Sequence, residues 1–437
     1  MTTTAIASGL IEQEARALLT RLERVRPFAL HETMVPAAAL APAAQLLIER
    51  FLLDGRRALG QRVRSFLSWL RGPGRTAPPA EQQRRFTVIR LQFNDVLSQF
   101  DTFTEVITQR SEHETGVWLS GLDVVAQDAL ALPGGYFEPP PVICYLARGP
   151  GAAIRRARTR LPGGVSNPVA IIRVPRERMV GHGVASSLIH EVGHQGAALL
   201  CLVESLRPVL REVRAAAPGS EQQPWYWFER WISEIVADLW SVAKVGIGST
   251  LGLVGVVSLP RWFVFRPSGD DPHPIPWIRV LLSCAMGQAL YPHPQWTVLA
   301  RTWRLLYPPD QVTDEHRRTL DALVAAIPAF VALLLGHRPP SLRGRSLQEV
   351  LRLADRRPER LAARYQAWRH APDEMLTAAP SLAFAVLGQA RAGGRLRPEL
   401  EGPVVGGLLT QWALRSTFDT SARCADRTTT LALPRAS

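Results

Sequence analysis

The chain is almost without lysine. Lys244 is the only lysine among 437 residues, so arginine supplies nearly all of the positive charge behind a formal net charge of +13. Arginine-rich codon usage explains this bias, and so does selection against lysine in an effector delivered into a host cell. A positive net charge favours acidic partners and membrane surfaces but does not determine the fold.

Cysteine is also scarce, and no two cysteines are paired by spacing. The four cysteines are far apart in the sequence, at Cys144, Cys201, Cys284 and Cys424. This pattern points to a reducing compartment and not to a disulfide scaffold. The first three lie in apolar runs, where cysteine acts as a small core residue. The N-terminus lacks the basic and apolar regions of a signal peptide, so we expect a cytoplasmic protein, with signal-independent export as the alternative.

Long hydrophobic runs are missing as well. The two candidates are Val245–Pro260 and Ala322–Gly336, and each is shorter than the roughly 20 residues that a membrane-spanning helix needs. We therefore expect no spanning segment and read both runs as parts of the core. The alternative is a peripheral contact in which such a run enters the membrane interface.

The sequence does contain His190-Glu191-Val192-Gly193-His194, a His-Glu-x-x-His pattern. On an α-helix, His190 and His194 lie one turn apart on nearly the same face, so both rings can reach one metal ion. Glu191 lies beside them, where it can take a proton from a metal-bound water. The pattern predicts a zinc-binding helix that carries its own general base.

The residues around this pattern argue against a solvated helix. They are apolar on nearly every side, namely Val184, Leu188, Ile189, Val192, Ala197, Leu199 and Leu200. A helix of this kind is buried, and buried polar side chains need partners. A bound metal would supply a partner for both histidines.

A second apolar segment, Trp231–Trp240, is also interrupted by acids. Glu234 is the expected third ligand. Asp238 follows one helical turn later, where it can accept the second ring N–H of a zinc-bound histidine. The two segments together predict one Zn²⁺ per chain, held by His190, His194 and Glu234.

These motifs resemble those of the gluzincin zinc metallopeptidases. The pattern Glu234-x-x-Ala237-Asp238, followed by Asp271-Pro272-His273-Pro274 and Arg279, is most similar to the family that includes the membrane-bound prenyl-protein protease and the bacterial heat-shock membrane protease. The resemblance covers about residues 140–310 and is confined to motifs. The chain departs from the membrane-bound members in lacking clear transmembrane helices.

The resemblance implies hydrolysis of a protein or peptide, with Glu191 as general base. It also places His273 near the reacting carbonyl as a transition-state donor, and Arg279 where it orients the loop or pairs with Asp238 or Asp271. A turn histidine that caps the following helix is the simpler reading of His273. In gluzincins an edge strand commonly binds the extended substrate, and Val169–Val174 is the candidate here, although an ordinary strand fits equally well.

We expect a mainly α-helical (α+β) protein with a zincin-like core and a small β-sheet beside the active-site helix. Short runs of β-formers at Val142–Leu146 and Val169–Val174 predict the strands. The predicted regions are a helical N-terminal region (1–80, with a Gly/Pro linker at 71–79), a second helical region (81–138), the metallopeptidase core (139–310) and a helical C-terminal region (311–437).

Two rival functions remain open at this point. One is a zinc-binding interaction protein without turnover, and the other is a delivered effector whose apolar segments contact a membrane. Binding to nucleic acid is not expected, although Arg356–His370 carries arginines together with Tyr365 and Trp368 on one predicted helix. The sequence does not indicate an oligomeric state.

Overall fold

The computed structural model describes residues 3–148, 151–176, 182–267 and 269–428. The protein is mainly α-helical with one small three-stranded sheet in this part of the chain, which confirms the expected fold class. The chain divides into two compact units. The first comprises the residues up to Leu119, Arg155–Ala170 and the residues from Ser416 onward, and the second comprises Ser120–Ile154 and Ile171–Arg415.

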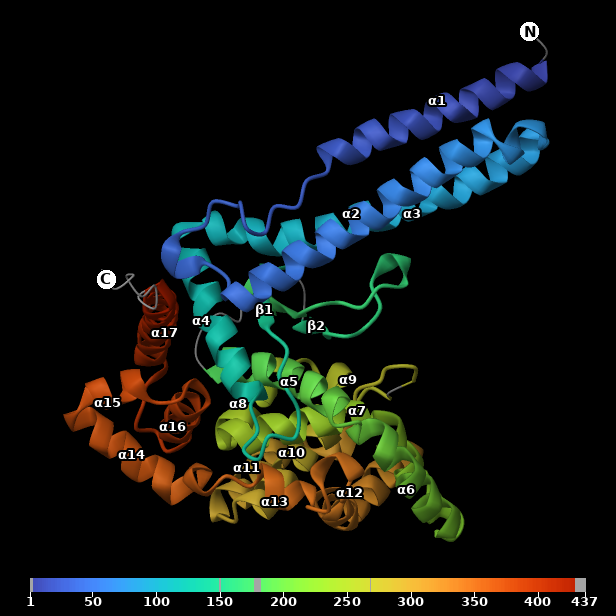
Figure 1. Ribbon diagram of the computed structural model, residues 1–437. Coiled ribbons are helices and arrows are strands. Elements are labelled where there is room, and N and C mark those ends of the chain that lie inside the picture. Colours follow the sequence, from blue (N-terminus) through green and yellow to red (C-terminus); the bar gives the residue numbers. More distant parts are fainter. Residues whose placement is uncertain (1–2, 149–150, 177–181, 268, 429–437) are drawn as a thin grey trace, which may run out of the picture. The chain divides into compact units, whose positions relative to one another are not determined.

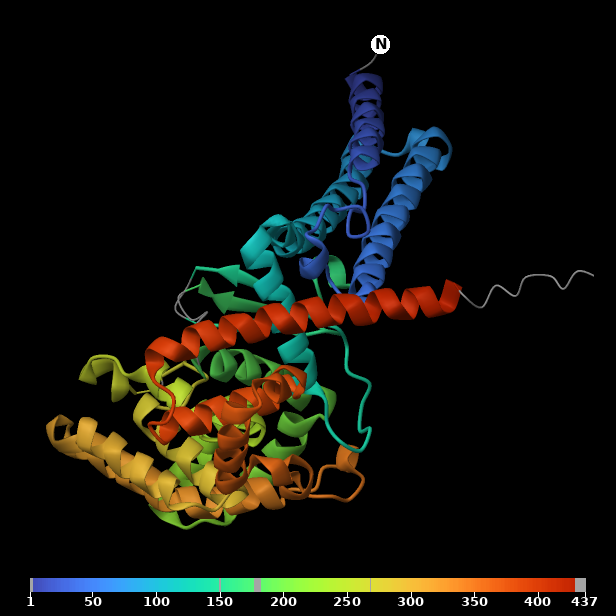
Figure 2. The same ribbon diagram turned by 90° about the vertical axis from the view of Figure 1, so that its left-hand side faces the viewer.

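Three long helices run alongside one another in the first unit (Figure 1, Figure 2). They are α1 (Thr3–Arg24), α2 (Pro42–Arg71) and α3 (Pro79–Thr108). Their apolar stripes face inward and bury side chains such as Leu18, Ile48, Leu52, Val63, Phe86 and Phe103. The expected linker at 71–79 is a tight turn between α2 and α3, in which Gly74 lies against the indole ring of Trp69.

The sheet has the strand order β1-β3-β2. Its strands are β1 (Val142–Ala147), β2 (Ala153–Arg155) and β3 (Ala170–Pro175). The interpretation of Val169–Val174 as a substrate-binding edge strand is therefore wrong, because β3 is hydrogen-bonded to a strand on each side. Its residues are almost all buried, whereas β2 is short, largely exposed and at an edge of the sheet.

Four consecutive helices form the centre of the second unit. They are α5 (His182–Leu199), α6 (Leu202–Ala216), α7 (Gln222–Val245) and α8 (Ile247–Val257). Helix α5 packs against both α7 and α8, and α7 is buried along nearly all of its second half. The segments that were expected to hold the metal are thus packed side by side in the core.

Helix α4 (His113–Leu130) precedes the sheet, and its residues belong partly to each unit. The helices after α8 are α9 (Arg261–Val264), α10 (Pro276–Leu290), α11 (Pro294–Leu306), α12 (Asp314–Gly336), α13 (Leu347–Leu351), α14 (Pro358–His370), α15 (Pro372–Thr377), α16 (Pro380–Ala392) and α17 (Pro398–Thr428). Several begin with proline, whose fixed φ suits the first helical position. Short 3-10 turns link many of these helices.

The two apolar runs form helices of different length. Val245–Pro260 includes α8, which is separated from α7 by a bend at Gly246, where φ is +58°. The second run belongs to α12, which starts eight residues earlier than expected and is 23 residues long. Within the described chain, α12 is the one helix long and apolar enough to cross a membrane, which is weak evidence because core helices share these properties. It packs on α7 and α10.

Two of the expected core cysteines are buried, but the third is not. Cys144 and Cys284 are buried free cysteines, whereas Cys201 is exposed. Cys201 lies at the reversal between α5 and α6 in a left-handed conformation, with φ at +51°. The prediction for Cys201 was wrong because a turn between α5 and α6 interrupts the apolar run at this residue. Cys424 lies near the end of α17, where the side chains are outside the described set.

Candidate metal centre

The candidate metal centre lies where α5 and α7 approach closely, and glycine makes the approach feasible. A Cβ atom added to Gly193 would lie 2.8 Å from the carbonyl oxygen of Ala237, and one added to Gly196 would lie 2.5 Å from the ring of Trp240. Real side chains do not tolerate such distances, so both positions need glycine. The sequence analysis missed this role, although two small residues three apart on a buried helix are a recognisable signal.

Three predicted ligands converge at this crossing. The nearest ligand atoms of His190, His194 and Glu234 all lie within 4.8 Å of one another. Nε2 of His190 is 3.2 Å from Oε2 of Glu234, and Nε2 of His194 is 3.4 Å from Oε1. Each side chain is 10–15% exposed. This group could hold one metal ion.

The carboxylate of Glu234 provides a test of that fit. Its Oε2 atom is buried and makes no hydrogen bond of acceptable geometry, although Nε2 of His190 and Nε2 of His273 are both 3.2 Å away. Burial raises the pKa of Glu234, but the closeness of His190 and His194 outweighs it and holds the pKa far below its usual range. A buried ionised oxygen without a hydrogen bond is costly, and a cation between the three side chains would satisfy it.

A buried ion pair orients the first histidine. Oδ1 of Asp238 accepts from Nδ1 of His190 at 2.8 Å, and the same carboxylate accepts from Nε and Nη2 of Arg279 at 2.7 and 2.9 Å. Because Nδ1 is engaged, Nε2 is the atom that faces Glu234. Of the two ion pairs considered for Arg279, the structure shows the one with Asp238. Asp238 therefore lies in the position expected for an outer acceptor.

Charge pairing outweighs burial in the pKa values of these groups. Burial raises the pKa of Asp238, but Arg279 and His190 lower it to about 2. Burial lowers the pKa of His190, and Asp238 with Glu234 raises it to about 9 in the absence of a metal. The pKa of Arg279 stays above its ordinary value, since Asp238 and Glu234 outweigh its desolvation. Metal binding would displace the proton of His190, because the ligand form is neutral.

The second histidine has a weaker partner that the sequence analysis did not single out. Oγ of Ser233 lies 3.4 Å from Nδ1 of His194. Ser233 precedes Glu234 on α7. The same helix therefore supplies the carboxylate near Nε2 of His194 and the hydroxyl near its Nδ1. A serine beside an acid on a buried helix gives no distinct signal in sequence.

The His-Pro loop reaches the same centre. Oδ1 of Asp271 accepts from the backbone N–H of His273 at 3.0 Å and from Nδ1 at 2.6 Å, while Oδ2 accepts from Arg266. Nε2 of His273 consequently faces Glu234. The alternative that His273 caps the next helix is wrong, because Ile275 occupies the N-cap of α10 and no side chain caps it. Arg266 was another residue that the sequence analysis missed.

A pocket of about 120 Å³ opens beside His190, one of the three candidate ligands. Among the residues that line it are His190, Glu191, His273 and Arg279. Glu191, which lines the pocket, is only 8% exposed. Gly151 and Ala152, just before the edge strand β2, also line it. The predicted base and the predicted donor therefore line one cavity.

The basic helix considered for nucleic acid has a different organisation. On α14, Trp368 is buried, and the hydroxyl of Tyr365 donates to the backbone of Arg395. Arg356, just before the helix, is buried and donates to the carbonyl of Lys244 and to Ser381. A buried indole cannot stack on a base, so this arrangement does not match an aromatic binding platform.

Comparison with known proteins gives no relative: no family model, no curated protein and no solved structure matches the chain. The side chains of the centre are therefore the basis for its chemistry. Those side chains are two imidazoles and one carboxylate that face a common point, with a second carboxylate in the adjoining pocket.

Proposed function

We propose that the protein is a zinc-dependent metallopeptidase of gluzincin type. The observation that carries the proposal is the convergence of His190, His194 and Glu234, with Glu191 in the adjoining pocket. Two imidazoles and a carboxylate are a donor set that zinc accepts, and three protein ligands leave the open position typical of a catalytic site. The family resemblance of the motifs supports the same assignment.

Each residue has a definite part in the proposed reaction. When bound, zinc supplies Lewis acidity to a water and to the substrate carbonyl. Glu191 accepts one proton from the attacking water and passes it to the nitrogen of the leaving amine. In its imidazolium form, with Nδ1–H kept on Asp271, His273 would donate its Nε2–H to the carbonyl oxygen as negative charge develops there. Asp238 and Arg279 hold His190 in the tautomer that leaves Nε2 free to bind.

The proposed substrate is a protein or peptide in an extended conformation. Since β3 is central, strand addition is available at β2, the edge strand that follows Gly151 and Ala152 in the pocket wall. A peptide paired with β2 would have its backbone groups satisfied as in a sheet. Such a peptide would lie beside the pocket that Gly151, Ala152 and Glu191 line. A cytoplasmic location remains an expectation from the sequence.

The test is cleavage of a proteome-derived peptide library by wild-type protein and by Glu191→Gln. The amide cannot accept the proton of the water, so Glu191→Gln should retain its metal and its fold and lose at least about 10²-fold in rate. Glu204→Gln is the matched control, because Glu204 is an exposed glutamate on α6. Cleavage by Glu191→Gln at the wild-type rate would contradict the proposal. If neither protein cleaves any peptide, a metal-binding protein without turnover becomes the better account.

A further inference from the structure

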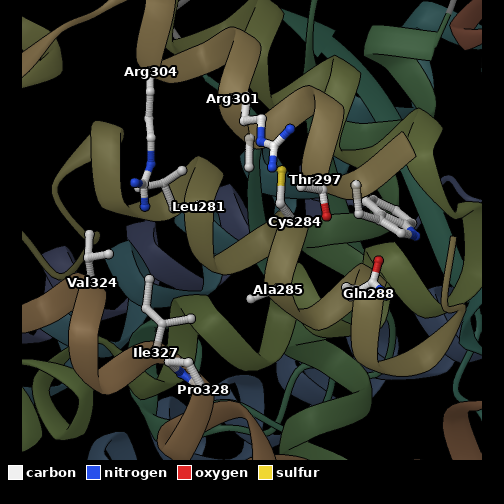
Figure 3. Close-up of a pocket in the computed structure, with 12 residues that line it drawn as sticks. Leu281, Cys284, Ala285, Gln288, Thr297, Arg301, Arg304, Val324, Ile327 and Pro328 are labelled. Atoms are coloured by element: carbon white, nitrogen blue, oxygen red, sulfur yellow. The ribbon is translucent and has the colours of Figure 1, made fainter. Parts of the chain in front are cut away.

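A second cavity, lined by residues of α10, α11 and α12, is shown in Figure 3. Its volume is about 430 Å³, within the range of small-molecule binding sites. It shares no lining residue with the pocket that contains Glu191 and His273. Nothing in the proposed peptidase mechanism uses it.

The floor and walls of this cavity are apolar. The apolar side chains are Leu281 and Ala285 of α10, Trp296 of α11, and Val324, Ile327 and Pro328 of α12. Cys284 adds to this wall, since burial raises the pKa of its thiol to about 12 and keeps it neutral. A surface of this kind suits a hydrocarbon chain, because burying methylene groups against apolar side chains removes them from water.

Positive charge is concentrated on one side. Arg301 and Arg304, one turn apart on α11, both extend toward the cavity in Figure 3. None of the described lining residues is acidic. Arg301 has no hydrogen bond or ion pair to any described residue, and Arg304 lies over the ring of Trp277 at 5.8 Å, which leaves its charge unneutralised. Two guanidinium groups without carboxylates favour an anion.

Neutral donors stand beside the same arginines. Thr297 and Gln288 line this cavity and also the adjoining hollow at His293, together with Arg301. A hydroxyl and an amide can each donate a further hydrogen bond to an oxyanion. The cavity thus combines an apolar floor with a polar, cationic rim, and the ligand that fits must have the same two parts.

We propose that this cavity binds a long-chain fatty acid, with its tail on the apolar floor and its carboxylate between Arg301 and Arg304. A planar carboxylate matches the fork of a guanidinium and needs no proton transfer to bind. Both arginines are exposed, so an uncharged lipid would gain no charge-assisted hydrogen bond from them, and a short acid would leave the apolar floor in contact with water. The site is independent of the metal centre and of peptide hydrolysis.

The experiment is calorimetric titration of the full chain with dodecanoate below its critical micelle concentration. We expect saturable binding of one dodecanoate per chain. Arg301→Gln and Arg304→Gln should each weaken it about tenfold, the value of one charge-assisted hydrogen bond. Arg364→Gln removes the same charge from an exposed position on α14 and should bind as wild type does. Ala285→Trp should fill the floor and abolish binding.

The ligands provide controls that need no variant. With wild-type protein, butanoate should not bind, and 1-dodecanol should bind about tenfold or more weakly than dodecanoate. Equal binding of the alcohol, or unchanged affinity in both arginine variants or in a folded Ala285→Trp, would overturn the proposal, as would the absence of saturable binding. A single-chain phosphate lipid that binds while dodecanoate does not would also overturn it. Glu191→Gln should bind dodecanoate like wild type, which separates this test from that of the peptidase.

Discussion

At the scale of single residues, carboxylates set the ring orientation of two histidines at the candidate metal centre. Asp238 engages Nδ1 of His190 and Asp271 engages Nδ1 of His273, so each ring turns its Nε2 toward Glu234. A buried arginine balances Asp238, and a partly exposed one balances Asp271. Residue identity and spacing predicted the three candidate ligands that lie together, but the partner of Arg279 and the role of Arg266 needed the structure.

His273 can be tested against a matched histidine. If it donates to the developing oxyanion, His273→Ala should lower kcat by about 10²–10³-fold while zinc content and KM stay near wild type. His293 is the control, because it also lies between two prolines but caps α11 by accepting from the backbone of Gln295. His293→Ala should lower stability by about 1 kcal/mol and leave kcat unchanged. Steady-state kinetics and thermal melts would distinguish these outcomes, and an unchanged kcat in His273→Ala would remove it from the reaction.

Lys244, the only lysine, gives a pH-dependent prediction. Its Nζ donates to the carbonyl of Ala131, and burial lowers its pKa to about 8 from an ordinary value of 10.5. Between these values the unfolded chain binds more protons than the folded one, so stability rises with pH across this window. The free energy of unfolding should rise by a few kcal/mol relative to Lys244→Met between pH 7 and pH 10.5. Urea unfolding of both proteins measures this rise. A stability difference that does not change with pH would show that burial does not lower the pKa of Lys244.

At the scale of elements, the sequence predicted the helices of the centre but not how they meet. The i, i+4 histidines and the spacing of Glu234 and Asp238 have meaning only on helices, so α5 and α7 could be foreseen. The closeness of the two helices depends on the absence of a side chain at Gly193, which no pattern of hydrophobicity reveals. The position of β3 in the sheet was likewise not predictable, because strand order depends on pairings far apart in the sequence.

The helix crossing can be tested by a pair of glycine substitutions. Gly193→Ala would place a methyl group 2.8 Å from the carbonyl of Ala237, so we expect a loss of about 1–3 kcal/mol and weaker metal retention as α5 and α7 separate. Gly255→Ala on α8 meets nothing within 4 Å and should stabilise the helix by up to about 1 kcal/mol. Urea unfolding and metal analysis measure both. Equal effects of the two substitutions would show that the close approach does not matter.

At the scale of the whole molecule, composition and periodicity predicted a mainly helical chain with a small sheet, and the structure agrees. The first unit is a set of long helices whose apolar stripes are visible in sequence. The second unit contains every residue of the candidate metal centre, which is drawn from α5, α7, α10 and the loop before α10. Chemistry could be foreseen in this unit because metal ligands are few in kind and fixed in spacing. The cavity under α11 carries no motif and appeared only in three dimensions.

The central claim is that α5 and α7 close one zinc site, and metal content tests it most directly. Protein purified without added metal should contain about one zinc per chain by plasma mass spectrometry. Glu234→Ala should retain far less, because two histidines alone make a poor site, whereas the exposed-surface control Glu204→Ala should retain the wild-type amount. Full zinc occupancy in Glu234→Ala, or wild-type protein without zinc that takes up none on titration, would contradict the account.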